Sequence, residues 1–278
     1  MKIELASSYG FCYGVKRAIN IAEKHQNSFT YGPLIHNKDE IKRLKDGFNI
    51  GLVEKIEEVK SDNTVVIRTH GIPKNELEVL KKQDNKIIDA TCPYVTTPQN
   101  IVAKMSKEGY SVVIFGDKKH PEIKGVVSYS SDKNHAFVVL DPSELDELPL
   151  KNKVAVVSQT TKKPVDFLKV VNKLILTHKE VRVFNTICNA TFENQDAASE
   201  LAKRADVMIV IGGRHSSNSK MLHSICEQEC KDSYLIENET ELDSNWFKDK
   251  KLCGISAGAS TPDWIIQNVV NKIQDINK

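Results

Sequence analysis

The stretch KIELASSYGFCYGVKRAINIAEKH, residues 2–25, decides the fold, because its pattern occurs three times along the chain. An apolar segment of strand length precedes Cys12, and a helix-like run follows it. The same order recurs around Cys92 in KIIDATCPYVTTPQNIVAKMSKEG (86–109) and around Cys188 in VRVFNTICNATFENQDAASELAKRA (181–205). We therefore expect each cysteine at a strand-to-helix turn, at the carboxyl end of a strand, where α/β folds place their chemistry.

Two further elements follow each cysteine segment. The second is an apolar strand, a glycine, a polar loop and a helix start, at residues 28–44, 111–127 and 206–225. The third is a strand, a polar loop and a proline near a helix start, at residues 63–82, 153–171 and 251–270. Proline fits the first helical turn because its missing N–H has no partner there. Such alternation predicts βαβ units and parallel sheets.

The nine strand–helix elements fall into three groups of three, which predicts an α/β protein of three small parallel-sheet lobes. We expect a pseudo-three-fold axis relating the lobes around a central cluster and cavity. Lobe 1 is residues 13–92, lobe 2 is 93–188, and lobe 3 is 189–278 plus 1–12, so that the first strand, at residues 2–6, joins the third sheet. Right-handed crossovers would turn the carboxyl end of every strand toward the axis.

Composition excludes several classes of protein. The net charge of +2 over 278 residues is too small to indicate a nucleic-acid surface. No apolar run reaches the roughly 18 residues that a membrane helix needs, and the N-terminus lacks the layout of a signal peptide. We expect a cytoplasmic protein with neither nucleic acid nor membrane as partner. Its six cysteines should then be reduced, which favours a metal or catalytic role over disulfides.

Three convergent thiolates at Cys12, Cys92 and Cys188 would bind a metal or an iron–sulfur cluster and leave one coordination position without a protein ligand. The alternative is three buried structural cysteines, since cysteine is among the most buried residue types. Cys226 and Cys230 are four residues apart on a predicted helix near His223, but lack a fourth ligand nearby. Cys253 lies within a predicted strand and is interpreted as a core residue.

The loops at the carboxyl ends of the other strands carry mostly neutral or cationic hydrogen-bond donors. Several lie at helix N-termini, which favour anions, so a phosphorylated or diphosphate ligand is predicted. These residues are His36, His70, His120, Thr161, Ser216, Asn218 and Ser260.

Glu122 is the acidic residue of this set. It is either a proton donor beside the bound anion or a first-turn glutamate that the helix dipole favours. Thr160 and Thr161 would hold a hydroxyl or relay a proton, or are simply β-formers. No nicotinamide- or flavin-binding motif is present, so electrons would come from another protein.

Nine motifs, in order over nearly the whole chain, resemble the 4-hydroxy-3-methylbut-2-enyl diphosphate reductase family of the non-mevalonate isoprenoid pathway. They are GFCYGVKRAI, YGPLIHN, RTHGIP, DATCP, HPE, SQTT, TICNAT, SSNS and SAGASTPDWI. The resemblance implies a [4Fe-4S] cluster on Cys12, Cys92 and Cys188, with Glu122 as the proton source and Thr160 as a partner of the substrate hydroxyl. The implied diphosphate ligands are His36, His70, His120, Ser216, Ser217, Asn218 and Ser260. Three residues depart from the family pattern: Lys119 replaces glycine, Asn194 replaces arginine and His215 replaces asparagine.

The implied reaction is a reductive dehydroxylation. Two electrons, from an external protein donor of the ferredoxin or flavodoxin type, and two protons would release water. Isopentenyl and dimethylallyl diphosphate would be the products. Two other classes remain open from the residues alone. One is a non-redox iron–sulfur hydro-lyase acting on a phosphorylated hydroxy substrate, which would need no reductant. The other is an anion-binding protein with structural cysteines.

Overall fold

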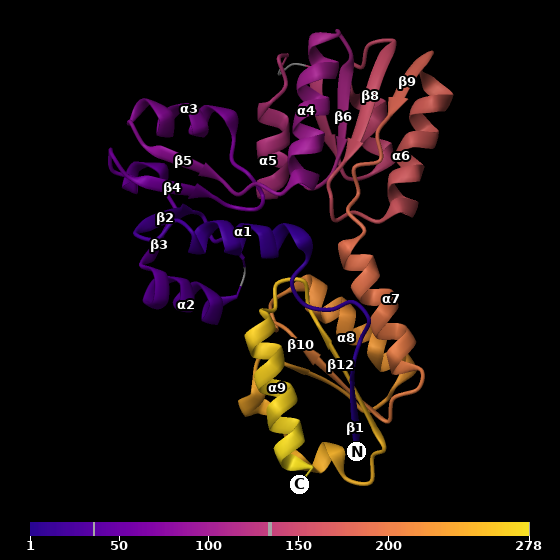
Figure 1. Cartoon of the computed structure of the whole chain (residues 1–278). Coiled ribbons are helices and arrows are strands. Elements are labelled where there is room, and N and C mark those ends of the chain that lie inside the picture. Colours follow the sequence, from indigo (N-terminus) through magenta and orange to yellow (C-terminus); the bar gives the residue numbers. More distant parts are fainter. Residues whose placement is uncertain (36, 133–134, 278) are drawn as a thin grey trace. The chain divides into compact units, whose positions relative to one another are not determined.

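The computed structural model describes residues 1–35, 37–132 and 135–277. Within them, twelve strands form three four-stranded sheets in which every pairing is parallel (Figure 1). The first sheet has the order β3-β2-β4-β5, the second β7-β6-β8-β9, and the third β11-β10-β12-β1. The strands are β1 (Lys2–Leu5), β2 (Ser28–Tyr31), β3 (Ile50–Val53), β4 (Thr64–Ile67), β5 (Lys86–Asp89), β6 (Ser111–Phe115), β7 (Ala136–Val139), β8 (Lys153–Ser158), β9 (Glu180–Val183), β10 (Val207–Ile211), β11 (Ser233–Ile236) and β12 (Leu252–Ala257).

The helices alternate with these strands, as the sequence pattern predicts. They are α1 (Tyr13–Glu23), α2 (Lys38–Phe48), α3 (Lys74–Lys82), α4 (Pro93–Lys107), α5 (Pro121–Ser128), α6 (Pro164–Thr177), α7 (Ala190–Ala202), α8 (Ser217–Glu229) and α9 (Asp263–Ile276). Pro164 opens α6, while Pro73 and Pro262 occupy the N-cap positions of α3 and α9. The predicted α/β class with three parallel sheets is confirmed, and β1 joins the third sheet beside β12, as expected.

The nine predicted elements omit one edge strand in each sheet, namely β3, β7 and β11. Each of these strands has four residues. Each is followed by a short 3-10 helix and not by an α-helix, so the alternation of strand and helix that identifies the other nine strands is absent there. The inner strands β6 and β10, by contrast, are buried along their whole length.

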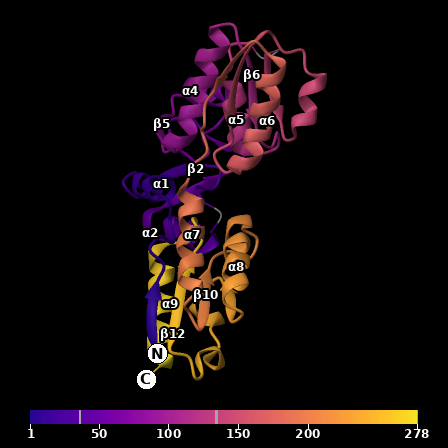
Figure 2. The ribbon, with the colours of Figure 1, turned by 90° about the vertical axis from the view of Figure 1, so that its right-hand side faces the viewer.

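The chain divides into two compact units. Unit 1 comprises Met1–Lys16, Ile35–Arg43 and Asn189–Lys278, and unit 2 comprises Arg17–Leu34 and Leu44–Cys188. The sheet of unit 1 is covered on one face by α9, through Ile265 and Val269, and on the other by α7 and α8, through Leu201 and Leu222 (Figure 2). This double burial explains the continuous apolar sequence of β10.

Unit 2 contains the other two sheets. Helices α4 and α5 pack on one face of the β6–β8 sheet, and α6 packs on the same sheet by stacking Phe167 on Phe115 with ring centroids 6.1 Å apart. Leu80 of α3 packs on the β4 sheet. The N–H of Lys74 in α3 donates to Ser128 Oγ in α5 at 2.9 Å. In the part of the chain that the structure describes, no helix has both the length and the apolar character to cross a membrane.

Candidate active site

The three repeated cysteines stand where the sequence predicts, between a strand and a helix. Cys12 immediately precedes α1, Cys92 is the N-cap of α4, and Cys188 lies two residues before α7. Each backbone N–H donates to a carbonyl in the loop of the third repeated element: Cys12 to Ala259 at 3.4 Å, Cys92 to Thr69 at 2.9 Å, and Cys188 to Thr160 at 2.7 Å. The threefold repeat of the sequence is therefore also a repeat of hydrogen bonding.

All three of these cysteines are partly buried. Cys12 belongs to unit 1, whereas Cys92 and Cys188 belong to unit 2. Among the described residues, no three His, Cys, Asp or Glu side chains are grouped closely enough to hold a metal ion, so the convergence of the three cysteines stays a prediction. The donor set itself fits an iron–sulfur cluster, because its members are sulfur ligands at equivalent turns and thiolates are the usual ligands of such clusters.

The other three cysteines lie in the core of unit 1. Cys226 and Cys230 pack with α7 and α8, and Cys253 packs with α9. Burial raises the pKa of the Cys226 and Cys253 thiols to about 12. Such groups stay protonated and make poor metal ligands. The interpretation of Cys253 as a core residue is confirmed.

Glu122 and Thr160 form a buried pair in unit 2, with exposed fractions of 1% and 6%. The Thr160 hydroxyl donates to Glu122 Oε2 at 2.7 Å, and the Thr160 N–H donates to Oε1 at 2.8 Å. Burial raises the pKa of the Glu122 carboxyl, while these two hydrogen bonds oppose the rise. Desolvation is the larger cause, so the neutral acid is favoured relative to a carboxyl in water.

His120 is the N-cap of α5, and its Nδ1 accepts the N–H of Glu122 at 3.2 Å. In the neutral ring the proton must then reside on Nε2, which makes Nε2 a donor. The ring of His70 lies edge-on to that of His120, with centroids 5.4 Å apart. Two of the predicted anion-binding histidines are thus brought together in unit 2, beside the residue predicted to supply the proton.

Unit 1 gathers a second group around the N-terminus of α8. Ser216 is its N-cap and accepts the N–H of Ser219 at 3.3 Å, Ser217 is its first residue, and Asn218 follows. A Cβ placed on Gly258 would lie 3.7 Å from Asn218 Nδ2, so this turn lies beside the loop that carries Ser260. The first turn of a helix has N–H groups without a partner inside the helix, and these groups and the helix dipole favour an anion at such a place. The predicted ligand His36 lies outside the described residues.

The structure also shows supporting residues that the sequence does not single out. Gln159 Oε1 accepts the N–H of Asp117 at 3.0 Å, and Gln159 Nε2 donates to Thr161 Oγ1 at 3.2 Å, which joins the HPE and SQTT loops. Ser219, in the first turn of α8, is fully buried. Gln159 lies in the SQTT motif and Ser219 in the SSNS motif. These motifs are the sequence signal from which both residues could have been identified.

The three departures from the family pattern differ in position. Lys119 and His215 are exposed. Asn194 is 4% exposed and makes two hydrogen bonds to the loop that precedes Cys12. Asn194 is therefore a buried structural partner of that loop.

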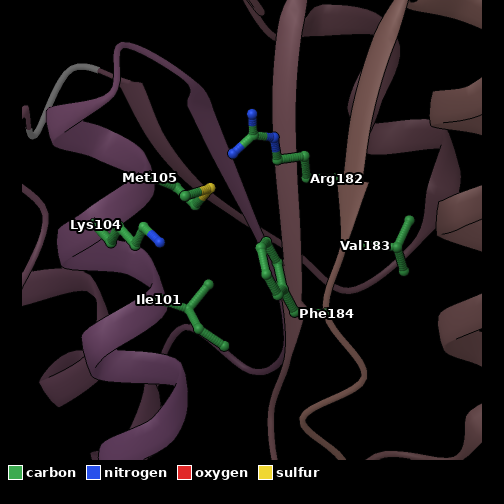
Figure 3. A pocket seen from close by; sticks show the side chains of 6 residues that line it. All are labelled: Ile101, Lys104, Met105, Arg182, Val183 and Phe184. Carbon is green, nitrogen blue, oxygen red and sulfur yellow. The ribbon is translucent and has the colours of Figure 1, made fainter.

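A cavity of about 500 Å³ lies elsewhere in unit 2. Its lining comes from α4 and from the end of β9, and in Figure 3 Phe184 stands between the two. The lining residues are Ile101, Lys104, Met105, Arg182, Val183 and Phe184. None of them is a predicted site residue.

Comparison with known proteins confirms the resemblance that the motifs indicate. A model of the LytB protein family matches residues 3–274. The 4-hydroxy-3-methylbut-2-enyl diphosphate reductase of Sulfurovum sp. (strain NBC37-1) is 74% identical over 274 residues, 99% of each chain. That of Campylobacter concisus (strain 13826) is 62% identical over 99% of this chain and 100% of its own.

Two solved structures share the fold. One is (E)-4-hydroxy-3-methyl-but-2-enyl diphosphate reductase, described as the terminal enzyme of the non-mevalonate pathway, with a TM-score of 0.84 and 42% identity over 99% of this chain and 100% of that chain. The other is the E-1-hydroxy-2-methyl-but-2-enyl-4-diphosphate reductase from Plasmodium falciparum, with a TM-score of 0.80 and 27% identity over 97% of this chain and 86% of that chain.

Proposed function

The chain belongs to the LytB protein family, and on that premise we propose that it is a 4-hydroxy-3-methylbut-2-enyl diphosphate reductase. In the proposed reaction the substrate C–O bond breaks, two electrons and two protons are consumed, and water leaves with formation of isopentenyl or dimethylallyl diphosphate. The observation that carries the proposal is the buried Glu122–Thr160 pair, whose Thr160 carbonyl is bonded to the N–H of Cys188. Glu122, the proposed proton source, is thus connected through Thr160 to the predicted cluster ligand Cys188.

We propose that Cys12, Cys92 and Cys188 hold a [4Fe-4S] cluster. When bound, this group supplies electrons and an iron that carries no protein thiolate and therefore serves as a Lewis acid. The role of the chain is to present three thiolates from equivalent turns. The cysteines Cys226 and Cys253 are fully buried among apolar side chains of the core and are not offered as ligands.

Protonation of the leaving oxygen is the work of Glu122 and Thr160. Glu122 is 1% exposed, so its carboxyl has little direct access to a ligand. The Thr160 hydroxyl, which is hydrogen-bonded to this carboxyl, would pass its proton to the substrate. A neutral Glu122 donates to Thr160 Oγ1, which in turn donates to the substrate hydroxyl. The raised pKa of Glu122 favours this neutral form before the reaction.

The diphosphate would be held by two groups of donors. One is the His70–His120 pair, in which His120 Nε2 is the donor. The other is the N-terminal turn of α8, from Ser216 to Asn218, together with Ser260. His36 stays a predicted ligand, from its loop position in the sequence and from the resemblance. Donors that bind the diphosphate orient the carbon chain, so binding energy from the unreactive end of the substrate assists the reaction.

The two electrons come from an external protein of the ferredoxin or flavodoxin type, since the sequence has no motif for a bound nicotinamide or flavin. The identity of this donor and the cytoplasmic location stay predictions.

The direct test is anaerobic purification, iron and sulfide analysis, and turnover of 4-hydroxy-3-methylbut-2-enyl diphosphate with and without a chemical reductant. We expect a coloured protein and turnover only with reductant. Turnover without reductant would indicate the hydro-lyase instead. A colourless, iron-free preparation would favour the anion-binding protein.

Cysteine variants test the ligand set. We expect Cys12→Ser, Cys92→Ser and Cys188→Ser each to lose the visible absorbance of the cluster. Cys226→Ser, Cys230→Ser and Cys253→Ser are the matched controls, and any of them that folds should keep the absorbance. Full cluster retention in Cys92→Ser would contradict the proposed set.

A further inference from the structure

Asn194 holds the segment between β1 and Cys12 from the side of α7. Its side chain is 4% exposed. The hydroxyl of Ser8 donates to Asn194 Oδ1 at 2.6 Å, and Asn194 Nδ2 donates to the carbonyl of Gly10 at 3.3 Å. A single amide thus supplies one acceptor and one donor to two positions, Ser8 and Gly10, in the run that leads to Cys12.

Backbone hydrogen bonds to β12 and to the loop after it also hold this segment. The N–H groups of Ala6, Gly10 and Cys12 donate to carbonyls on or just after β12: Ala6 to Ile255 at 2.9 Å, Gly10 to Ala257 at 3.0 Å, and Cys12 to Ala259 at 3.4 Å. The last of these is the longest, so the hold of β12 is weakest at the cysteine. Gly10 has a φ of +68°, and a Cβ there would approach Ile266 Cδ1 to 2.9 Å, so this position of the segment requires glycine.

The place of Asn194 in the sequence adds to its significance. It lies in α7, the helix that follows Cys188. Its amide therefore joins the helix after one repeated cysteine to the loop before another. An arginine side chain has no acceptor for the Ser8 hydroxyl, and an ionised aspartate has no donor for the Gly10 carbonyl, whereas the amide of Asn194 supplies both.

We propose that Asn194 is a positioning residue for Cys12: it sets the conformation of residues 8–12 and so presents the Cys12 thiolate for cluster binding. The inference rests on the proposed function, in that Cys12 is taken to be a cluster ligand. The restraint of Cys12 does not itself require the cluster, so it applies to the iron-free protein as well. The role differs from general stabilisation of unit 1, because it acts on one cysteine.

The test measures the alkylation rate of each cysteine by iodoacetamide in iron-free protein, by mass spectrometry. In Asn194→Ala we expect Cys12 to react about fivefold faster or more. Loss of about one hydrogen bond shifts the equilibrium between the closed and the open loop by this factor, and the open loop exposes Cys12 to the reagent. Cys92, in unit 2, should react at the parent rate. Asn238→Ala is the matched control, because Asn238 also makes two side-chain hydrogen bonds in unit 1, both to Thr240.

Ser8→Ala removes one of the two contacts and gives the milder variant that decides the matter where Asn194→Ala does not fold. It should raise the Cys12 rate in the same direction. The double variant should exceed Asn194→Ala by little, because both changes break the same contact. After reconstitution, Asn194→Ala should also lose iron to a chelator faster than the parent.

An unchanged Cys12 alkylation rate in folded Asn194→Ala, or in Ser8→Ala where that variant alone folds, would overturn the positioning role. Equal acceleration at Cys12 and Cys92 would also overturn it, since that pattern signals general loosening. Failure of the proposed function has a different signature: full cluster retention in Cys12→Ser would reject Cys12 as a ligand and leave the alkylation result standing.

Discussion

Thr160 donates twice to Glu122, through its hydroxyl to Oε2 at 2.7 Å and through its backbone N–H to Oε1 at 2.8 Å. Both oxygens of one carboxyl are thereby oriented by one residue. The Thr160 hydroxyl can serve as donor or acceptor: it accepts a hydrogen bond from neutral Glu122 as readily as it donates one to the ionised form. The Thr160 carbonyl meanwhile accepts the N–H of Cys188 at 2.7 Å, so Glu122, Thr160 and the Cys188 turn form one continuous chain of hydrogen bonds.

Glu122→Gln should lower single-turnover rate by roughly 100-fold or more, the scale of a missing general acid. The amide is nearly isosteric, so cluster content and diphosphate binding should be retained. Glu76→Gln is the matched control: Glu76 also lies in the first turn of a helix and accepts a hydroxyl hydrogen bond, from Tyr31 at 2.9 Å. Normal turnover of Glu122→Gln with a lowered melting temperature would leave Glu122 a structural role only.

Glu122 should also make folding stability depend on pH. Burial raises its pKa above the ordinary 4.5, so the folded chain binds this proton more tightly than the unfolded chain. The resulting stabilisation is fully present below pH 4.5 and is lost as pH rises through the raised value. Urea unfolding of the parent and of Glu122→Gln across this range should show the parent losing stability relative to the variant as pH increases. A difference that does not vary with pH would contradict the raised pKa.

His120 should show separable capping and binding roles. In His120→Asn the amide oxygen can still accept the N–H of Glu122, because asparagine is a good N-cap, but the donor at the position of Nε2 is lost. We expect near-parent stability and a KM raised about tenfold or more, the loss expected for one hydrogen bond to a charged group. His120→Ala should lose both functions. An unchanged KM in His120→Asn would show that His120 only caps α5.

Ser219 should be coupled to Gly212. A Cβ on Gly212 would lie 2.3 Å from Ser219 Oγ, so Gly212→Ala should overpack the base of α8 and destabilise by about 1–3 kcal/mol. Ser219→Gly removes the obstructing side chain, at the cost of about 0.5–1 kcal/mol for glycine in a helix. In the double variant the Gly212→Ala change should therefore cost less than it does alone. Additive losses in the urea midpoints would show that the two sites do not share this space.

The amino-acid sequence by itself determined the repeat, the parallel sheets and the position of each cysteine between strand and helix. These features follow from local patterns: apolar runs of strand length, prolines at helix starts, and crossovers whose handedness is fixed for L-amino acids. The roles predicted for Cys12, Glu122 and His70 came from motifs within the same short segments. The edge strands β3, β7 and β11 were missed because a short 3-10 helix follows each of them in place of an α-helix, so the strand–helix pattern that identified the other strands is absent.

The tertiary structure alone decided what surrounds those residues. Glu122 and Thr160 are 38 positions apart, and Ser8 and Asn194 are 186 apart. The same letters describe an exposed first-turn glutamate and a buried acid with a raised pKa, or an asparagine on a surface and one that holds the Cys12 loop. Burial and hydrogen bonding between distant segments separate these cases, because desolvation depends on which other parts of the chain cover a group and not on its neighbours in sequence.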